Sequence, residues 1–286
     1  MKHHPSPLRY PGGKSRAISQ LLPFFPAAPS TIISPFFGGG SVELALAARG
    51  WRVLGFDAYR PLVDFWQQAL TDRMRLADEV TKHYPLTVEN FKRLQVEGYR
   101  LQTQLERAAA FYVLNRSSFS GTTCSGGMSP GHARFNLKAI ERLRQFRAPN
   151  LWVEKADFKR SISEHPNAFL FCDPPYITAR RLYGRNGNLH DQFDHEGLRD
   201  LLKGRGQWLL CYGDCSDARY MYGGRRIVPL QWKWGMSRHK QSNEAVILSD
   251  DLPVPCALCA ERLRVPNPLA DVLEELRREV VPAGAG

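Results

Sequence analysis

The first sixty residues carry the pattern that most limits the fold. Thr31–Ser34 has the composition of a short buried strand, and the glycine run Gly38–Gly40 ends it. We expect Ser41 to cap a helix over Val42–Ala48, and Arg52–Phe56 to form the next strand. Two parallel strands need a crossover connection, which is usually a helix. The order strand, helix, strand therefore predicts a parallel sheet with helices on its faces.

The same alternation returns in the second half of the chain. Four further apolar runs have strand character, and one helical stretch lies among them: Leu151–Val153, Ala168–Cys172, Gln207–Tyr212, Ala245–Leu248 and the helix His195–Leu202. Between the two halves the pattern is helical, at Pro61–Leu70, Thr87–Gln95 and Gln104–Leu114. These elements together predict the α/β fold class, with an inserted, mainly helical region.

Charge and hydropathy restrict the partners. Thirty-nine Lys and Arg against 28 Asp and Glu give a net charge of +11, which favours a polyanion such as nucleic acid. No apolar run reaches the roughly 18 residues of a membrane span, and Met1–Pro7 lacks the apolar core of a secretion signal. We therefore expect a cytoplasmic protein without a membrane partner.

The tetrapeptide Asp173-Pro174-Pro175-Tyr176 directly follows a predicted strand. Open α/β sheets bind ligands beyond the carboxyl ends of their strands. The two prolines have no N–H donors, so the segment offers carbonyl and carboxylate acceptors beside the flat face of Tyr176. This chemistry suits a planar amine, whereas the alternative is a rigid turn with an exposed tyrosine.

A second candidate site follows the first strand. The turn Phe36–Gly40 is rich in glycine, which lets a ligand approach the backbone, and Asp57 stands at the end of the next strand. An acid at this offset typically accepts hydrogen bonds from ribose hydroxyls. The sequence therefore suggests a nucleotide-like ligand at this turn.

Six segments, in this order, resemble the Dam-like DNA adenine-N6 methyltransferases, which use S-adenosylmethionine: Tyr10-Pro-Gly-Gly-Lys14, Pro35–Ser41, Asp57, Leu114–Gly121, Ala156-Asp-Phe158 and Asp173–Tyr176. The resemblance implies a Rossmann-like class I methyltransferase sheet with helices on both faces. It also implies a cofactor-binding catalytic domain over residues 1–60 and 148–265, an inserted helical target-recognition region over 61–147, and a C-terminal helix and tail over 266–286.

The resemblance also implies a set of residues that bind S-adenosylmethionine: Tyr10, Lys14, Phe37, Gly38, Gly40, Asp57, Asp157, Phe158 and Asp173. Within this set Asp57 is expected to hold the ribose, and Asp157 and Phe158 to bind the cofactor adenine. Tyr10 and Lys14 are expected to border the target base as well. The plain alternative for Lys14 is a surface lysine.

The resemblance makes Asp173, Pro174, Pro175 and Tyr176 the catalytic residues. The lone pair of an adenine amino nitrogen is delocalised into the ring, and acceptors that bind its hydrogens localise it. Methyl transfer is then a displacement that depends on positioning, which can contribute roughly 7–11 kcal/mol. A base within a duplex must be flipped out to reach such a pocket. No metal is indicated.

The turn-rich segment Ser117–Arg134 is predicted to be an exposed loop or hairpin that reads the DNA sequence, with a lid over the cofactor as the alternative. The residues expected to contact DNA are Arg116, Ser120, Arg134, Arg180 and Arg181. The sequence departs from the family in three places, the first being Tyr10, where Trp is commoner. Ser34 stands where an acid is usual, and the loop lacks the usual Asn before Gly121 and the Arg after it, so the target sequence does not transfer.

The expected function is therefore site-specific methylation of adenine N6 in DNA, in a phage or bacterial setting. The alternatives are a cytosine-N4 methyltransferase, an RNA adenine methyltransferase and a catalytically silent DNA-binding subunit. Double-stranded DNA is the expected partner, and a cognate restriction endonuclease is a further partner that the resemblance allows. We expect a monomer or a weak dimer.

Overall fold

The computed structural model describes residues 5–98, 100–123, 126–129, 134–177, 193–231 and 243–255. The chain up to Leu252 forms one compact unit, and a second unit begins at Pro253. Arg180, Arg181 and the predicted tail over 266–286 lie outside the described residues. Within the described ranges no helix has the length and hydropathy of a transmembrane segment.

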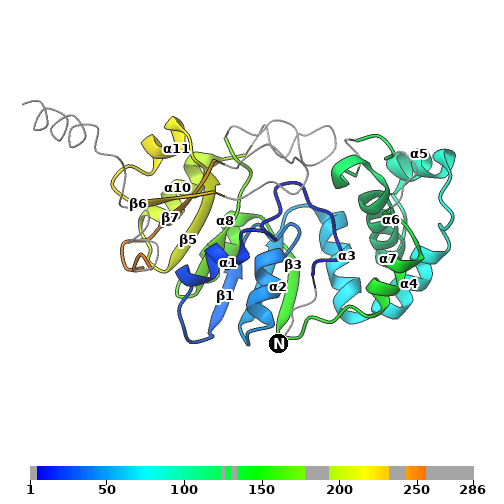
Figure 1. The fold of residues 1–286 in the computed structure, drawn as a ribbon, viewed down its shortest axis with the longest axis horizontal. Coiled ribbons are helices and arrows are strands. Elements are labelled where there is room, and N and C mark those ends of the chain that lie inside the picture. The colour runs from blue at the N-terminus through cyan, green and yellow to red at the C-terminus, as the bar shows by residue number, and fades with distance from the viewer. Residues whose placement is uncertain are drawn as a thin grey trace, which may run out of the picture. The chain divides into compact units, whose positions relative to one another are not determined.

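A seven-stranded sheet runs through the first unit (Figure 1), in the order β3-β2-β1-β4-β5-β7-β6. Its strands are β1 (Thr31–Ser34), β2 (Arg52–Asp57), β3 (Leu151–Lys155), β4 (Phe169–Cys172), β5 (Trp208–Gly213), β6 (Arg226–Leu230) and β7 (Glu244–Leu248). The first five are parallel, and β7 runs antiparallel to both β5 and β6. The predicted α/β fold class is confirmed.

The central strands are continuous apolar runs because both faces of the sheet are covered. Every residue of β4, β5 and β7 is buried. Parallel strands covered by helices on both faces lose the alternation of buried and exposed residues. This burial fixes the ends of β4 and β5, where polar residues begin.

Among the described residues, six helices accompany the strands: α1 (Ile18–Leu21), α2 (Ser41–Ala47), α3 (Arg60–Thr71), α8 (Phe158–Ser163), α10 (His195–Lys203) and α11 (Ser216–Met221). The predicted cap of α2 is wrong by one residue. Gly40, with φ of 64°, is the N-cap, and Ser41 is the first helical residue. Glycine adopts this left-handed conformation without the steric cost of a Cβ atom.

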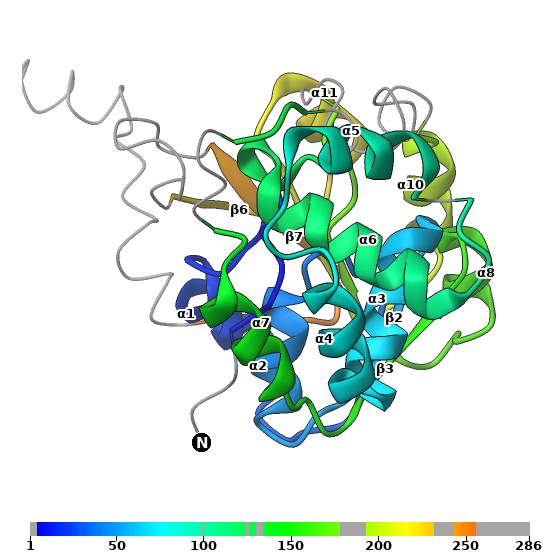
Figure 2. The ribbon, with the colours of Figure 1, turned by 90° about the vertical axis from the view of Figure 1, so that its right-hand side faces the viewer.

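Four helices follow α3 and pack together (Figure 2): α4 (Arg73–Thr81), α5 (Val88–Glu97), α6 (Gln104–Ser117) and α7 (Leu137–Arg144). The helix α6 is buried from Ala108 to Asn115. Its N-terminus carries a capping box, in which Thr103 and Glu106 satisfy each other's backbone N–H groups. The predicted helical region between the two halves of the sheet is therefore present.

The expected exposed loop over Ser117–Arg134 is wrong at its base. Ser117 is the last residue of α6 and donates a hydrogen bond to the Val113 carbonyl at 2.6 Å. Ser117 and Ser118 are fully buried, and Ser118 pairs with Met128 in an isolated antiparallel bridge. The helix runs further than its apolar pattern indicates, and the buried Ser117 hydroxyl is satisfied within it by this carbonyl.

Candidate functional site

A cavity of about 520 Å³ opens at the carboxyl ends of the central parallel strands. Its wall contains every residue that the sequence assigned to catalysis or to the cofactor: Tyr10, Lys14, Phe37, Gly38, Gly40, Asp57, Asp157, Phe158, Asp173, Pro174, Pro175 and Tyr176. The fold thus gathers segments that are more than 150 residues apart in sequence, since Lys14 and Asp173 differ by 159 positions.

Asp57 fixes the glycine-rich turn after β1. One carboxylate oxygen accepts from the Gly38 N–H at 3.0 Å, and the other accepts from the Tyr59 N–H at 2.9 Å. Trp66 Nε1 donates to the Gly38 carbonyl at 3.0 Å. Burial raises the pKa of Asp57 to about 6, although both backbone N–H groups lower it. Each oxygen keeps a lone pair for a ligand donor.

The side chains of Phe37 and Tyr10 pack closely around this turn. The Phe37 side chain is only 2% exposed and packs edge-on against Trp66, with ring centroids 5.1 Å apart. A Cβ atom at Gly55 would lie 2.2 Å from the Phe37 ring, and one at Gly39 would lie 2.6 Å from Tyr10 Cβ. The turn is therefore held in one conformation.

Asp157 and Phe158 begin α8 at another part of the wall. Asp157 is the N-cap and accepts from the Arg160 N–H at 3.0 Å. The Phe158 ring packs against Phe36 and Phe193, with centroid distances of 5.6 Å and 5.2 Å. Phe36 and Phe193 also line the cavity, and the sequence assigned no role to either. Phe193 comes from a different part of the chain, so no local motif indicated it.

Lys14 is the centre of a buried charge cluster. Its ammonium lies 2.8 Å and 2.9 Å from the two carboxylate oxygens of Asp173 and 3.4 Å from Glu244 Oε2. It also donates to the Gly12 carbonyl at 3.0 Å. The Lys14 side chain is 4% exposed, so the alternative of a surface lysine is wrong.

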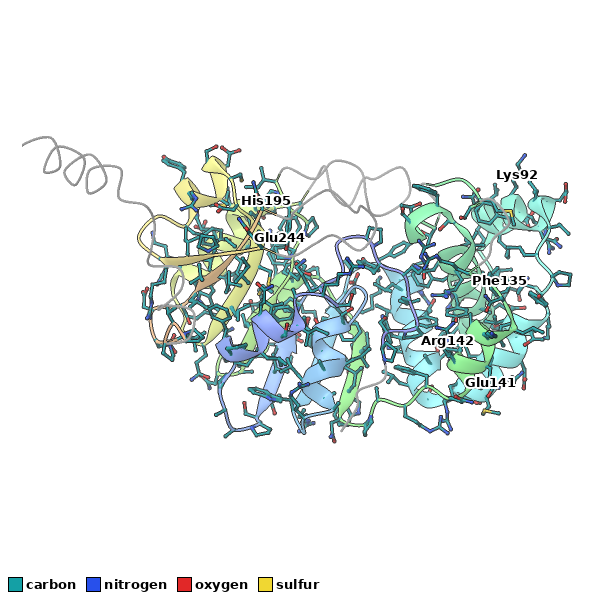
Figure 3. The ribbon with its side chains drawn as sticks, in the orientation of Figure 1. Lys92, Phe135, Glu141, Arg142, His195 and Glu244 are labelled. Carbon is teal, nitrogen blue, oxygen red and sulfur yellow. The ribbon has the colours of Figure 1, made fainter. Side chains whose placement is uncertain are left out.

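Tyr176 completes this cluster. Its hydroxyl donates to Glu244 Oε2 at 2.5 Å and lies 3.4 Å from Asp173 Oδ1. The Lys14 ammonium lies 5.0 Å from the centroid of the Tyr176 ring, within range of a cation–π interaction. Glu244 is the first residue of β7 (Figure 3), and the sequence analysis missed it. Its one local signal is a charged residue directly before the apolar run Ala245–Leu248.

The charges in the cluster support one another. Burial by itself lowers the pKa of Lys14. The charges of Asp173 and Glu244 raise this pKa by more than burial lowers it, so the net shift is upward and Lys14 stays protonated. Burial raises the pKa of Asp173, and Lys14 opposes this shift. The pKa of Glu244 is raised by burial and lowered by Lys14 in the same way. The cluster thus presents an acceptor carboxylate, Asp173, beside a fixed cation.

Ser34 replaces the acid that is usual in the resembling family, and a neighbouring acid contacts it. The Ser34 hydroxyl donates to Glu43 Oε1 at 2.7 Å, and Glu43, from α2, is 3% exposed. Glu43 also lines the cavity. Burial raises the pKa of Glu43 to about 7, although the Ser34 hydrogen bond lowers it. A carboxyl group is thus present at this position, on a helix instead of a strand.

Three of the residues expected to contact DNA lie at the start and end of the predicted recognition loop. Arg116 Nε donates to the Arg134 carbonyl at 3.1 Å, and Ser120 has a φ of 56°. Burial lowers the pKa of Arg9, and the positive charges of Arg134 and Arg116 lower it further. The sequence analysis gave no role to Arg9 or to Phe119, whose side chain is 66% exposed.

Asn115 joins this loop to the N-terminal segment. Its side-chain oxygen accepts from the Arg9 N–H at 2.8 Å, and its Nδ2 donates to the Arg9 carbonyl at 2.7 Å. The same Nδ2 donates to the Gly121 carbonyl at 3.2 Å. Asn115 is fully buried, so it ties Arg9 to the base of the loop.

Comparison with known proteins agrees with this geometry. A model of the D12 class N6 adenine-specific DNA methyltransferase family matches residues 10–236. The chain is similar to the type II methyltransferase M1.LlaDCHI of Lactococcus lactis subsp. cremoris, with 23% identity over 215 residues, 68% of this chain and 75% of the relative. It is also similar to the type II methyltransferase M.CviBI of Paramecium bursaria Chlorella virus NC1A, with 19% identity over 242 residues, 81% of this chain and 92% of the relative.

Proposed function

Because the chain belongs to the D12 class of N6 adenine-specific DNA methyltransferases, we propose which of its residues bind S-adenosylmethionine and which bind the adenine that is methylated in DNA. Asp57 and the aromatic wall around Phe158 bind the cofactor. The segment Asp173–Tyr176 binds the target adenine. The contact between Asp173 and the buried Lys14 carries this proposal, because it places an oriented acceptor at the end of β4.

The residues in the cavity fit S-adenosylmethionine. A volume of about 520 Å³ lies in the range of small-molecule sites. Asp57 retains acceptor capacity for ribose hydroxyls, and Phe36 and Phe158 offer apolar faces to an adenine ring. The bound cofactor supplies an electrophilic methyl group. The protein supplies orientation and exclusion of water.

Asp173 and Pro174 act on the target base. The Asp173 carboxylate and the Pro174 carbonyl accept the hydrogens of the N6 amino group, which localises the nitrogen lone pair. Lys14 occupies part of the acceptor capacity of Asp173, but two oxygens provide about four lone-pair sites. Lys14 also favours the ionised form of Asp173. The carboxylate is therefore suited to hold a proton of the amino group during the reaction.

Duplex DNA would lie across the loop that contains Phe119 and Ser120. The exposed Phe119 ring is available to fill the space that a flipped adenine leaves, since base flipping exposes apolar stacking surface. Arg9, Arg116 and Arg134 would contact phosphates or a base edge. Arg180 and Arg181 remain candidates for the same role from outside the described residues.

The association state and the biological partner extend this proposal. Both relatives named above are type II methyltransferases, which supports a cognate restriction endonuclease as a partner. We propose a monomer or a weak dimer acting on double-stranded DNA. Sedimentation with and without a duplex measures the association state, and protection of host DNA against endonucleases of matching specificity identifies the partner.

The direct test is expression in a host that lacks DNA methylation, followed by sequencing of modified bases and digestion to nucleosides. We expect N6-methyladenine within one short motif and none in cells that express Asp173→Ala. N4-methylcytosine would instead indicate the cytosine enzyme, and methylation of RNA alone would indicate an RNA enzyme. Either result would overturn the proposed use of the pocket.

A further inference from the structure

We infer that Glu244 is a positioning residue for methyl transfer, because it holds the Tyr176 ring and the Lys14 ammonium around the place of the target amine. The inference rests on the proposal that adenine binds against Tyr176. Glu244 lies outside the residues that match the family model. No motif in the sequence links it to the catalytic segment.

The contacts of Glu244 are short and buried. Its Oε2 accepts from the Tyr176 hydroxyl at 2.5 Å and lies 3.4 Å from Lys14 Nζ. Its side chain is 3% exposed. The same Glu244 oxygen therefore contacts the Tyr176 hydroxyl and the Lys14 ammonium, and both of these groups also lie near the Asp173 carboxylate.

The backbone around Glu244 is rigid. Glu244 pairs with Gly213 of β5 on one side and with Leu230 of β6 on the other. The Asp214 N–H donates to the Asn243 carbonyl at 3.0 Å, which continues the ladder beyond the strand. A side chain on an inner strand can hold a partner more closely than one on a loop. Glu244 is thus fixed by strand pairing on both sides, and its hydrogen bond positions Tyr176, which lies beyond the end of β4.

Removing Glu244 would change the acceptors at the reacting centre. The Tyr176 hydroxyl would then have Asp173 Oδ1, at 3.4 Å, as its remaining acceptor in the cluster. Lys14 would lose one of its two carboxylates and would interact with Asp173 alone. After both changes, the Tyr176 hydroxyl and the Lys14 ammonium would bind the Asp173 oxygens that the adenine amino group needs as acceptors. The adenine amine would therefore meet a weaker acceptor and a displaced ring.

The test compares Glu244→Ala, Glu244→Gln, Tyr176→Phe and the double variant Glu244→Ala/Tyr176→Phe in the full chain. The exposed strand residue Glu154 supplies a matched control, Glu154→Gln. The substrate is a duplex with the methylated motif of the wild-type protein. A second duplex carries 2-aminopurine at the target position, whose fluorescence reports stacking of the flipped base.

We expect Glu244→Ala to lower kcat by about tenfold to 100-fold, since displacing a positioned group by about 1 Å can cost roughly 100-fold. The KM for S-adenosylmethionine and its calorimetric affinity should stay within about threefold, a change below 1 kcal/mol. Glu244→Gln keeps an acceptor for the phenol and should restore part of kcat. The 2-aminopurine signal of Glu244→Ala should differ from that of the wild type.

The double variant separates positioning from a general loss of structure. If Glu244 acts through the Tyr176 hydroxyl, Glu244→Ala should cost less in the Tyr176→Phe background than in the wild type. Additive losses, unchanged kcat in Glu244→Ala, or equal loss of cofactor affinity in Glu244→Ala and Glu244→Gln would overturn the inference. If Tyr176→Ala leaves kcat unchanged, the proposed adenine site fails instead, which distinguishes the two failures.

Discussion

At the scale of single residues, the site depends on where charge is buried. Lys14 brings one positive charge to two carboxylates, Asp173 and Glu244; the Lys14 and Glu244 side chains are buried, and Asp173 lies at the cavity wall. An ion removed from water is stable only when such partners surround it. The cluster therefore needs all of its members, and each substitution changes the charge felt by the others.

Asp173→Ala should abolish methyl transfer but change S-adenosylmethionine affinity by less than about tenfold, or roughly 1.4 kcal/mol. The reason is that, in the proposed site, the carboxylate is the acceptor for the target amine, while Asp57 and the aromatic wall are the proposed cofactor-binding groups. Radiolabelled methyl transfer and calorimetry measure the two quantities. Turnover comparable with the wild type would refute the catalytic role of Asp173.

Cofactor binding should depend on pH through Asp57. Its pKa is raised by burial to about 6, and ribose hydroxyls donate more strongly to the ionised carboxylate. Affinity should therefore be highest above pH 6 and should fall as the pH decreases through that value. Asp57→Asn should remove this dependence and weaken binding by about 1–3 kcal/mol. Calorimetry from pH 5 to pH 8 tests both statements, and equal pH profiles in the two proteins would count against them.

The stability of the protein should depend on pH through Glu43. Burial raises the pKa of its carboxyl from 4.5 to about 7 in the folded state, so the folded chain binds this proton more tightly than the unfolded chain does. The stabilising effect is complete below about pH 4.5 and is lost as the pH rises through 7, a difference of up to about 3 kcal/mol.

Glu43→Gln should remove this loss of stability at high pH. The free energy of unfolding of the variant, relative to that of the wild type, should therefore increase between pH 6 and pH 8. Urea unfolding at several pH values measures the difference. Exposed Glu89→Gln serves as a control with no expected change in this range. A constant difference between wild type and Glu43→Gln over the whole range would contradict the assignment.

At the scale of elements, α6 supports the base of the loop that we propose reads the DNA sequence. Asn115 anchors the loop to the backbone of Arg9, and a Cβ atom at Gly121 would lie 2.1 Å from the Arg9 carbonyl oxygen. Gly121 also has a φ of 78°. The base of the loop is therefore held by contacts with the N-terminal segment.

Replacing Ser120–Gly131 with a Gly-Ser linker that keeps glycine at position 121 should eliminate site preference and retain cofactor affinity. The linker preserves the close approach to Arg9 but removes the side chains that we propose contact DNA. Sequencing of modified bases in the host and calorimetry with S-adenosylmethionine provide the measurements. If the methylated motif stays the same, sequence recognition lies elsewhere.

At the scale of the whole molecule, the net charge of +11 favours association with the DNA polyanion, and the number of phosphate contacts sets the response of binding to salt. Each phosphate contact releases counterions, so affinity falls steeply with ionic strength. We expect the DNA affinity to drop by at least about 100-fold between 50 and 200 mM salt, as for a protein that makes several phosphate contacts. Fluorescence anisotropy with a labelled duplex measures this slope.

Arg9→Ala should lower the salt slope by about one if Arg9 contacts a phosphate, and should weaken all sequences alike. Arg52→Ala, on the exposed start of β2 at the opposite ends of the strands from the cavity, is the matched control. A loss confined to one position of the motif would show that Arg9 reads a base instead. An unchanged slope would remove Arg9 from the interface.

The sequence by itself predicted the strands β1 to β5 and β7 and the order of the motifs, but not β6 or the antiparallel direction of β7. Apolar runs such as Phe169–Cys172 and Trp208–Tyr212 are buried strands because every side chain in them avoids water. Glycine and proline mark the turns that follow, because their backbone preferences are local. These properties depend on neighbours in the chain, so the parallel sheet, the turn at Gly38–Gly40 and the segment Asp173–Tyr176 could all be predicted.

Only the tertiary structure decided which distant groups meet. Glu244 reaches Tyr176 because β7 lies antiparallel beside β5, and no local pattern specifies that pairing. Lys14 is buried because the N-terminal segment crosses the end of β4, and Glu43 meets Ser34 because the turn after β1 leads into α2, which packs against β2 and β3. The charge, burial and proton affinity of the site residues depend on these contacts between separate segments, because an electrostatic interaction depends on distance in space and not on distance along the chain.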